Sequence, residues 1–293
     1  MPQAQLFKGA LLLTLSCLLF ALMGVLIREI STNVNTETIV FARNFIGLIL
    51  FLPIILKKGY QSFNTKIYHL HLVRSLVGVS AMYCFFYAIA NLPLTDAMLF
   101  TYAAPVFTPV IAYIWLKEAI TPKTYLAVAV GFAGVCLVIK PGSGIANKDA
   151  LIGLAACILA AMAYVSVRRL TRSESSQQIV FYYCLNASFF SFLPLLLNWQ
   201  ILNLEQCGYL IVIAMLATAS QLFLSKAYSL APAGQIGPIS YSAIFYAGLL
   251  AWLIWGEVPD IFSITGILLV VVSGLITLDY KYHPPKASNS AIK

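Results

Sequence analysis

The chain has 293 residues, of which 61% are hydrophobic and only 10% are charged, and its formal net charge is +8. A soluble domain usually carries about 25% charged residues, so this composition excludes a water-soluble fold and indicates a protein whose main solvent is lipid. The Lys and Arg residues lie between apolar runs and form no basic patch among aromatic residues. The positive charge therefore does not indicate a nucleic-acid partner.

Ten apolar runs follow one another along the chain, each near the length of about 20 residues that a helix needs to cross a hydrocarbon core. The first run is too long for the apolar part of a signal peptide, so we expect it to be a membrane span. The ten predicted helices are residues 8–28, 36–56, 70–91, 93–116, 122–140, 150–169, 177–198, 206–229, 233–255 and 260–279.

The basic residues are distributed unequally between the two sides of this predicted bundle. If the N-terminus is cytoplasmic, 14 of the 18 Lys and Arg residues fall on the cytoplasmic side and 3 on the other side, with Arg43 inside a span. Membrane proteins concentrate basic residues in their cytoplasmic loops. We therefore predict a multi-pass protein of the bacterial inner membrane with both termini in the cytoplasm.

The two halves of the chain show an internal repeat. Residues 93–118 align with residues 232–257, and in both segments an aromatic-rich helix ends in a glutamate, Glu118 or Glu257, that is soon followed by a proline. Because a repeat of five helices is odd-numbered, the second copy must enter the membrane from the opposite side, as in many secondary transporters. The predicted fold class is an all-α integral membrane protein of ten transmembrane helices arranged as two inverted five-helix repeats. The predicted parts are residues 1–145, residues 146–280 and a cytoplasmic polar tail of residues 281–293.

Motifs in the second, third and fourth predicted helices form a recognisable set. They are Phe41-Ala42-Arg43 with Pro53, Arg74-Ser75-Leu76-Val77-Gly78, Leu92-Pro93-Leu94-Thr95-Asp96-Ala97, Pro105-Val106-Phe107 and Trp115-Leu116-Lys117-Glu118. With these motifs the chain resembles the drug/metabolite transporter superfamily, in its ten-helix EamA-type branch. The family pattern is incomplete, because Ala119 stands where members carry Arg and Ile244 stands where a second copy of Pro105 is expected.

The resemblance implies a secondary carrier that works by alternating access, with a cavity lined by helices 1, 3, 4, 6, 8 and 9. Similar members export amino acids and other metabolites, and some take up S-adenosylmethionine. We expect export of an amino acid or amino-acid-like solute, and uptake of a nucleoside-like or sulfonium metabolite is the alternative. A non-transporting scaffold or receptor is the candidate of a different class. The expected partners are the solute and the lipid bilayer, and the sequence leaves open whether the protein is a monomer or a dimer.

Arg43 lies about two turns into the second predicted helix. An arginine in hydrocarbon costs at least about 2.5–3.5 kcal/mol, and such residues usually face the interior of a bundle. Arg43 could contact the substrate, pair with Asp96 or Glu257, or extend to the outer headgroups. As the only buried cation expected, it favours a neutral, zwitterionic or singly charged solute. We expect Arg74 at the cytoplasmic end, where it could pair with Glu118.

Polar and aromatic residues gather at the middle level of the bundle, where inverted repeats place their substrate. A buried Tyr, Asn or Gln needs a hydrogen-bond partner, so each of these residues could pack between helices or line a cavity. The candidate substrate-binding residues are Phe20, Arg43, Tyr83, Tyr87, Tyr102, Tyr164, Asn186, Gln221 and Tyr241. Ser16, Tyr183 and Ser240 lie at the same predicted level.

Enzyme and metal motifs are absent from the sequence. It contains no phosphate-binding loop and no HExxH motif, and its six cysteines form no CxxC pair. We therefore expect no catalytic residues, no cofactor and no metal. Every carboxylate lies near a helix end, with Asp96 the deepest. Proton-driven carriers usually keep an acidic residue or a histidine within the membrane, so we expect facilitated diffusion or substrate exchange.

Proline and glycine positions give two further expectations. Pro105 should kink the fourth helix near its middle, which would turn a free carbonyl toward the cavity beside Tyr102. The fifth and tenth helices should pack closely, because small residues let helix backbones approach one another in membranes. The glycines concerned are Gly131, Gly134, Gly266 and Gly274.

Overall fold

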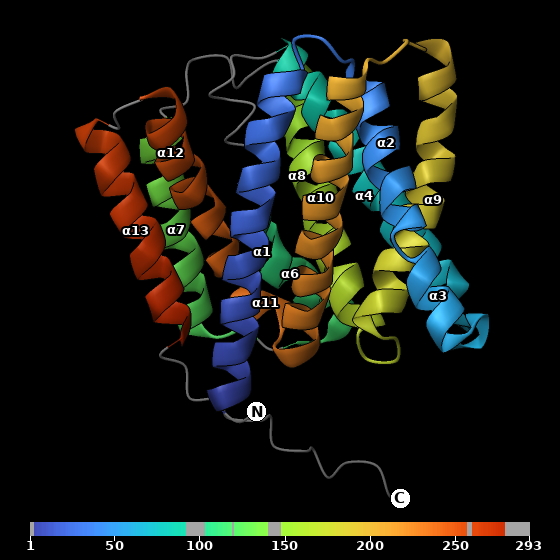
Figure 1. Ribbon diagram of the computed structural model, residues 1–293. Coiled ribbons are helices and arrows are strands. Elements are labelled where there is room, and N and C mark those ends of the chain that lie inside the picture. The colour runs from blue at the N-terminus through green and yellow to red at the C-terminus, as the bar shows by residue number, and fades with distance from the viewer. Residues whose placement is uncertain (1–2, 92–102, 119, 140–147, 257–259, 279–293) are drawn as a thin grey trace, which may run out of the picture.

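The computed structural model describes residues 3–91, 103–118, 120–139, 148–256 and 260–278, and these residues form helices and their connections without a strand. The first half contains α1 (Gln3–Ile30), α2 (Thr36–Ile49), α3 (Leu52–Lys58), the 3-10 helix η1 (Tyr60–Phe63), α4 (Tyr68–Asn91), α6 (Ala104–Leu116) and α7 (Pro122–Ile139). The second half contains α8 (Lys148–Leu170), α9 (Ser176–Leu197), α10 (Leu204–Leu230), α11 (Ala233–Ile236), the 3-10 helix η3 (Gly237–Tyr241), α12 (Ser242–Trp255) and α13 (Ile261–Leu278). Figure 1 shows the long helices side by side in one bundle.

The outside of this bundle is suited to lipid. Six of the described helical segments are long and apolar enough to cross a membrane, and the shorter helices of residues 104–116, 122–137 and 264–276 are apolar too. Large apolar side chains such as Phe189 and Leu197 are exposed on the surface. Extended exposed apolar surface marks contact with a membrane or another protein. The predicted all-α membrane fold is confirmed, and the described elements group into the ten predicted spans.

Helix contacts relate the two halves of the bundle. α1 packs along α10 as α8 packs along α4, and α1 contacts α12 as α8 contacts α6. Likewise α2 contacts α10 as α9 contacts α4, while the contacts of α7 with α13 and of α2 with α9 join equivalent helices. This exchange of partners is the pattern that two repeats related by a twofold axis produce. It agrees with an inverted duplication of five helices.

Glycines bring α7 and α13 close together. A Cβ atom at Gly134 would lie 2.6 Å from the carbonyl oxygen of Gly266, and one at Gly131 would collide with the ring of Tyr241. These positions therefore allow the close helix packing that was expected. Gly274 has open space where a Cβ would lie, so it does not contribute to this contact.

Prolines divide two of the predicted helices. The second predicted helix ends as α2 at Ile49 and begins again as α3 at Leu52, with Pro53 in the first turn. Proline lacks an N–H donor and its ring clashes with the preceding turn, so it interrupts a helix. The ninth predicted helix consists of α11, η3 and α12, with Pro238 at the start of η3. Pro105 lies in the first turn of α6. Residues 92–102, which include Tyr102, fall outside the described residues, so the predicted kink does too.

Candidate substrate-binding site

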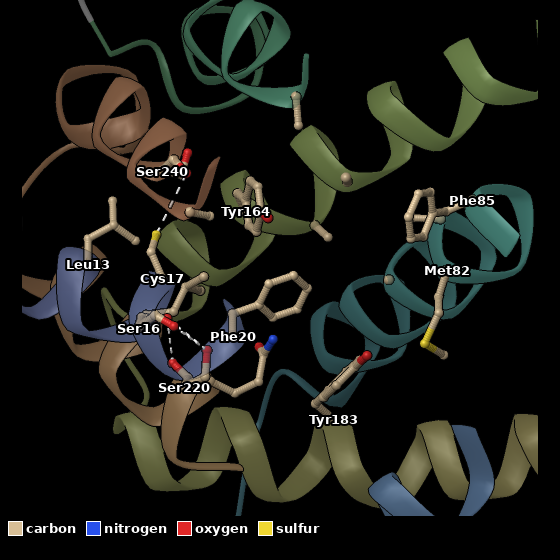
Figure 2. A pocket seen from close by; sticks show the side chains of 18 of the residues that line it. Leu13, Ser16, Cys17, Phe20, Met82, Phe85, Tyr164, Tyr183, Ser220 and Ser240 are labelled. Atoms are coloured by element: carbon tan, nitrogen blue, oxygen red, sulfur yellow. Dashed lines mark hydrogen bonds between the residues drawn. The ribbon is translucent and has the colours of Figure 1, made fainter. Parts of the chain in front are cut away.

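A cavity of about 190 Å³ lies between the two halves of the bundle. All six spans expected to line it contribute side chains, and two more spans add Arg43 from α2 and Tyr183 from α9. Figure 2 shows Phe20, Tyr164 and Tyr183 around this space, each projecting from a different helix. The cavity therefore has contributions from both repeats, at the level where inverted repeats place a substrate.

One wall of the cavity is formed where α1 crosses α10. The Ser16 hydroxyl donates to the carbonyl of Ser220 at 2.8 Å, and the Ser220 hydroxyl donates to the carbonyl of Ser16 at 2.9 Å. The Cys17 thiol, one residue further on, lies 3.8 Å from the carbonyl of Ser240 in η3. These contacts, drawn in part as dashed lines in Figure 2, fix the turn of α1 that carries Phe20 into the cavity.

Arg74 on α4 also lines the cavity, and the residue is only 4% exposed. Its Nη2 donates to Oε1 of Gln221 at 3.0 Å, and its Cζ lies 4.3 Å from the ring centroid of Tyr183. Its Nε is buried without an acceptor in the described part of the chain. The guanidinium thus has a hydrogen bond to an amide and a cation–π contact, both with neutral groups.

Gly78 makes this position of Arg74 possible. It follows Arg74 by one helical turn, and a Cβ at Gly78 would collide with Nη1 of Arg74. The same Cβ would lie 3.2 Å from Cε2 of Tyr183. The absence of a side chain at Gly78 lets the guanidinium fold back along its own helix and lie over the tyrosine ring.

Arg43 reaches the other end of the same tyrosine. Its Nη2 donates to the hydroxyl oxygen of Tyr183 at 3.4 Å, and Arg43 is part of the cavity lining. The carboxylates proposed as its partners, Asp96 and Glu257, lie outside the described residues. Within the described ranges neither Arg43 nor Arg74 forms an ion pair. Among the described residues, the two guanidinium groups that flank Tyr183 therefore have neutral partners only.

Four of the nine candidate residues line the cavity, namely Phe20, Arg43, Tyr164 and Gln221. Four others lie away from it. Asn186 accepts a hydrogen bond from the Tyr68 hydroxyl at 2.7 Å and donates to Ser75 at 3.3 Å, so it joins α4 to α9. Tyr241 is fully buried against Val135 and Val270, between α7 and α13. The remaining candidate, Tyr102, falls outside the described residues.

Tyr83 and Tyr87 lie on the wrong face of α4 for the cavity. The lining residues Arg74, Gly78 and Phe85 are spaced by four and seven positions, which places them on one face of the helix. Tyr83 and Tyr87 are four residues apart on the opposite face. Tyr83 packs with Val79 and Tyr183, and Tyr87 is 40% exposed on the surface. Aromatic character alone therefore did not identify the face that lines the cavity.

Glu118 has partners other than the expected Arg74. Its Oε1 lies 2.8 Å from Nε of Arg168 and 3.7 Å from Nη2 of Arg172, and Nη1 of Arg168 donates to the carbonyl of Tyr228 at 2.7 Å. The predicted pair of Arg74 with Glu118 is wrong, because Arg74 is buried in the cavity lining, near the half-buried Arg43. Sequence reasoning counted Arg74 as a flanking residue because it is near the start of its span. The glycine one turn later was the available signal.

Apolar side chains fill the bundle between the cavity and the end where α1 begins, the lower end in Figure 1. This cluster extends from the cavity wall, because Leu13 of α1 and Leu224 of α10 belong to both. Its other members include Leu6, Ala10, Val167, Leu170, Ala227, Tyr228, Ala231 and Ile236. The Glu118–Arg168 pair lies at this same end, where α6 and α8 terminate. The cluster and the ion pair together separate the cavity from this end.

The described helices group into ten apolar spans in two related halves with a cavity between them, an arrangement typical of multi-pass membrane transporters. The chain belongs to the EamA-like transporter family, whose model matches residues 7–140 and again residues 147–278. The resemblance to the drug/metabolite transporter superfamily is therefore confirmed, and the chain is a transporter of small molecules and not an enzyme.

Relatives with printed functions cover nearly the whole chain. The pseudopaline exporter CntI of Pseudomonas aeruginosa is 31% identical over 269 residues, which is 91% of this chain and 94% of the relative. The S-adenosylmethionine uptake transporter of Rickettsia prowazekii is 24% identical over 264 residues, 90% of each chain. One crystal structure, 16% identical, superposes with a TM-score of 0.79 over 92% of this chain and 95% of its own, which shows the same fold. Because one relative is named for export and the other for uptake, the family fixes neither direction nor substrate.

Proposed function

We propose that this protein is a secondary transporter of the bacterial inner membrane that exports an amino acid or amino-acid-like metabolite by alternating access. The observation that carries the proposal is the cavity between the two halves. Arg43 and Arg74 flank Tyr183 there, and other aromatic side chains also line the cavity. Buried arginines are costly in a membrane protein and usually belong to a functional site. A small solute with both a polar and an apolar part is complementary to such a lining.

The orientation follows from the distribution of basic residues, which supports cytoplasmic termini. On this orientation the apolar cluster around Leu13 and Leu224 and the Glu118–Arg168 pair lie between the cavity and the cytoplasm. Alternating access then requires that α6 and α8 separate at this ion pair when the cavity opens inward. Residues 1–145 and 146–280 would be the two units that move. The similarity to an exporter at 31% identity supports the outward direction.

Uptake of a nucleoside-like or sulfonium metabolite is the second candidate, supported by the similarity to the S-adenosylmethionine uptake transporter. The cavity favours the first candidate, because its volume of about 190 Å³ suits an amino acid better than a larger nucleoside-like solute. We propose facilitated diffusion or exchange as the mode of transport, whether the protein works as a monomer or a dimer.

The test is a thermal-shift screen of the purified protein against metabolites, followed by counterflow in proteoliposomes. A ligand that binds the folded state raises its apparent stability, so the screen selects solutes for transport. We expect amino acids or their derivatives to stabilise the protein and labelled solute to exchange with unlabelled solute inside the vesicles. Binding without exchange would contradict the transporter and support the receptor alternative. Accumulation driven by an imposed pH gradient would contradict the proposed mode.

A further inference from the structure

In the described part of the chain, the guanidinium group of Arg74 has fewer hydrogen-bond acceptors around it than it has N–H donors. Arg74 has five N–H donors, and among the described residues its polar partners are Oε1 of Gln221 and the side chain of Tyr183. Its Nε is buried and without an acceptor among those residues. A buried cation is stable only when paired and fully hydrogen-bonded, so an incompletely bonded guanidinium in a cavity needs an anion there.

Arg43 and Arg74 both contact Tyr183 in the lining of the cavity. Arg74 covers the ring face at 4.3 Å and Arg43 contacts the hydroxyl at 3.4 Å, so both guanidinium groups border the same side chain. All three residues line the cavity. A guanidinium presents parallel N–H groups that match the two oxygens of a carboxylate, which makes arginine the preferred side chain for this anion.

We infer that the cavity binds its solute by a carboxylate held between Arg43 and Arg74, and that this contact sets the substrate class. The inference rests on the proposed function and extends it to a specific anchoring group. The rest of the solute lies against the apolar and aromatic wall formed by Phe20, Phe85 and Tyr164, seen in Figure 2. The ring faces there attract an ammonium group, which suits the other end of an amino acid.

The size of the cavity limits the solute as well. Its volume of about 190 Å³ is below the 300–1,000 Å³ of sites for drug-sized ligands. A single carboxylate also suits two guanidinium groups better than a polyphosphate, whose charge would exceed theirs. An amino-acid-sized carboxylate is therefore the solute class that the cavity fits best.

The experiment compares carboxylates with their neutral amides. The purified full-length protein is titrated with benzoate, L-phenylalanine and L-leucine, and in parallel with benzamide, L-phenylalaninamide and L-leucinamide, while thermal unfolding is recorded. We expect the carboxylates to raise the melting temperature and the amides to have little effect. Arg74→Gln should weaken carboxylate binding about 10- to 100-fold, the effect of losing a hydrogen bond to a charged group. Arg172→Gln, a change of an arginine outside the cavity, should leave it unaltered.

Three results would overturn the inference: equal stabilisation by amides and carboxylates, carboxylate binding unchanged in Arg74→Gln, or no response to any of the three carboxylates. Stabilisation by chloride alone, with no further gain from carboxylates, would overturn it as well. Counterflow separates this inference from the proposed function. Exchange of a neutral solute that is insensitive to Arg74→Gln would remove the carboxylate site and leave the transporter. Carboxylate binding without exchange would support the carboxylate site and contradict the proposed transport.

Discussion

Two pairs of arginines in this protein differ in the charge of the groups that they contact. Arg168 and Arg172 share the carboxylate of Glu118 at the end of the bundle where α6 and α8 terminate. Arg43 and Arg74 lie in the cavity, and in the described part of the chain they contact only neutral groups. Among the described residues, the first pair has a carboxylate counter-ion and the second pair has none. The first pair joins helices, and the carboxylate site proposed above assigns the second pair to the solute.

Removal of Glu118 should produce the largest effect in this comparison. The side chains of Glu118 and Arg168 are each 12% exposed, so Glu118→Ala leaves a nearly buried cation without its counter-ion. We expect a loss of about 3–5 kcal/mol in the free energy of unfolding, the effect of breaking a buried pair on one side. Thermal unfolding of the purified variant measures it. Glu205→Ala, at the exposed first turn of α10, is the control, and an equal effect of both changes would break the comparison.

Arg74→Gln should affect binding and not stability. We expect a loss of about 1.5–3 kcal/mol in carboxylate binding, from the missing charged hydrogen bonds. The melting temperature should stay the same or rise, because the change removes a buried charge that has no carboxylate partner in the described residues. Arg168→Gln should behave in the opposite way, with lower stability and unchanged carboxylate affinity. A marked fall in the stability of Arg74→Gln would mean that Arg74 holds helices together as Arg168 does.

A methyl group at Gly78 should disturb Arg74 without changing any charge. Because the added Cβ collides with Nη1 of Arg74, we expect Gly78→Ala to cost about 1 kcal/mol, near fivefold in carboxylate affinity. The effect should shrink in an Arg74→Gln background, which a double-mutant cycle measures. Gly24→Ala is the matched control, because nothing lies within 4 Å of a Cβ there. An undiminished effect in the double variant would show that Gly78 acts on something other than Arg74.

The smallest effect should come from Tyr183→Phe. The change keeps the ring beneath Arg74 and removes the hydroxyl that Arg43 contacts at 3.4 Å. A hydrogen bond of this length is weak, so we expect about 0.5 kcal/mol, or about a twofold loss of carboxylate affinity. Tyr183→Leu removes the ring as well and should have a larger effect. If both variants bind equally, the ring does not position Arg74.

The sequence was sufficient for the fold because the relevant signals are long and repeated. Apolar runs of about 20 residues predicted the spans, and the two aligned segments predicted the duplication that the exchanged helix contacts show. The breaks at Pro53 and Pro238 were missed, because a proline in an apolar run does not reveal whether a helix bends or stops. Neither helix break alters the number of predicted spans.

The site was less predictable, because polarity does not specify which way a side chain points. Tyr83 and Tyr87 were chosen as aromatic residues at the right depth, yet they lie on the face of α4 opposite Arg74. Arg74 was assigned to the cytoplasmic end because it opens the predicted span of residues 70–91, and only the room at Gly78 lets it reach Tyr183. That arrangement depends on contacts between α4 and α9, which are far apart in the sequence.

The most direct test of the central claim is a crystal structure of the protein with 4-bromobenzoate, located by the anomalous signal of bromine. The account predicts the carboxylate between Arg43 and Arg74, with oxygens about 2.7–2.9 Å from guanidinium nitrogens, as charge-assisted hydrogen bonds require. The bromine should then lie at the aromatic wall that contains Phe20. A carboxylate directed away from both arginines, or a cavity without bromine signal, would contradict the claim that this cavity receives its solute through a carboxylate.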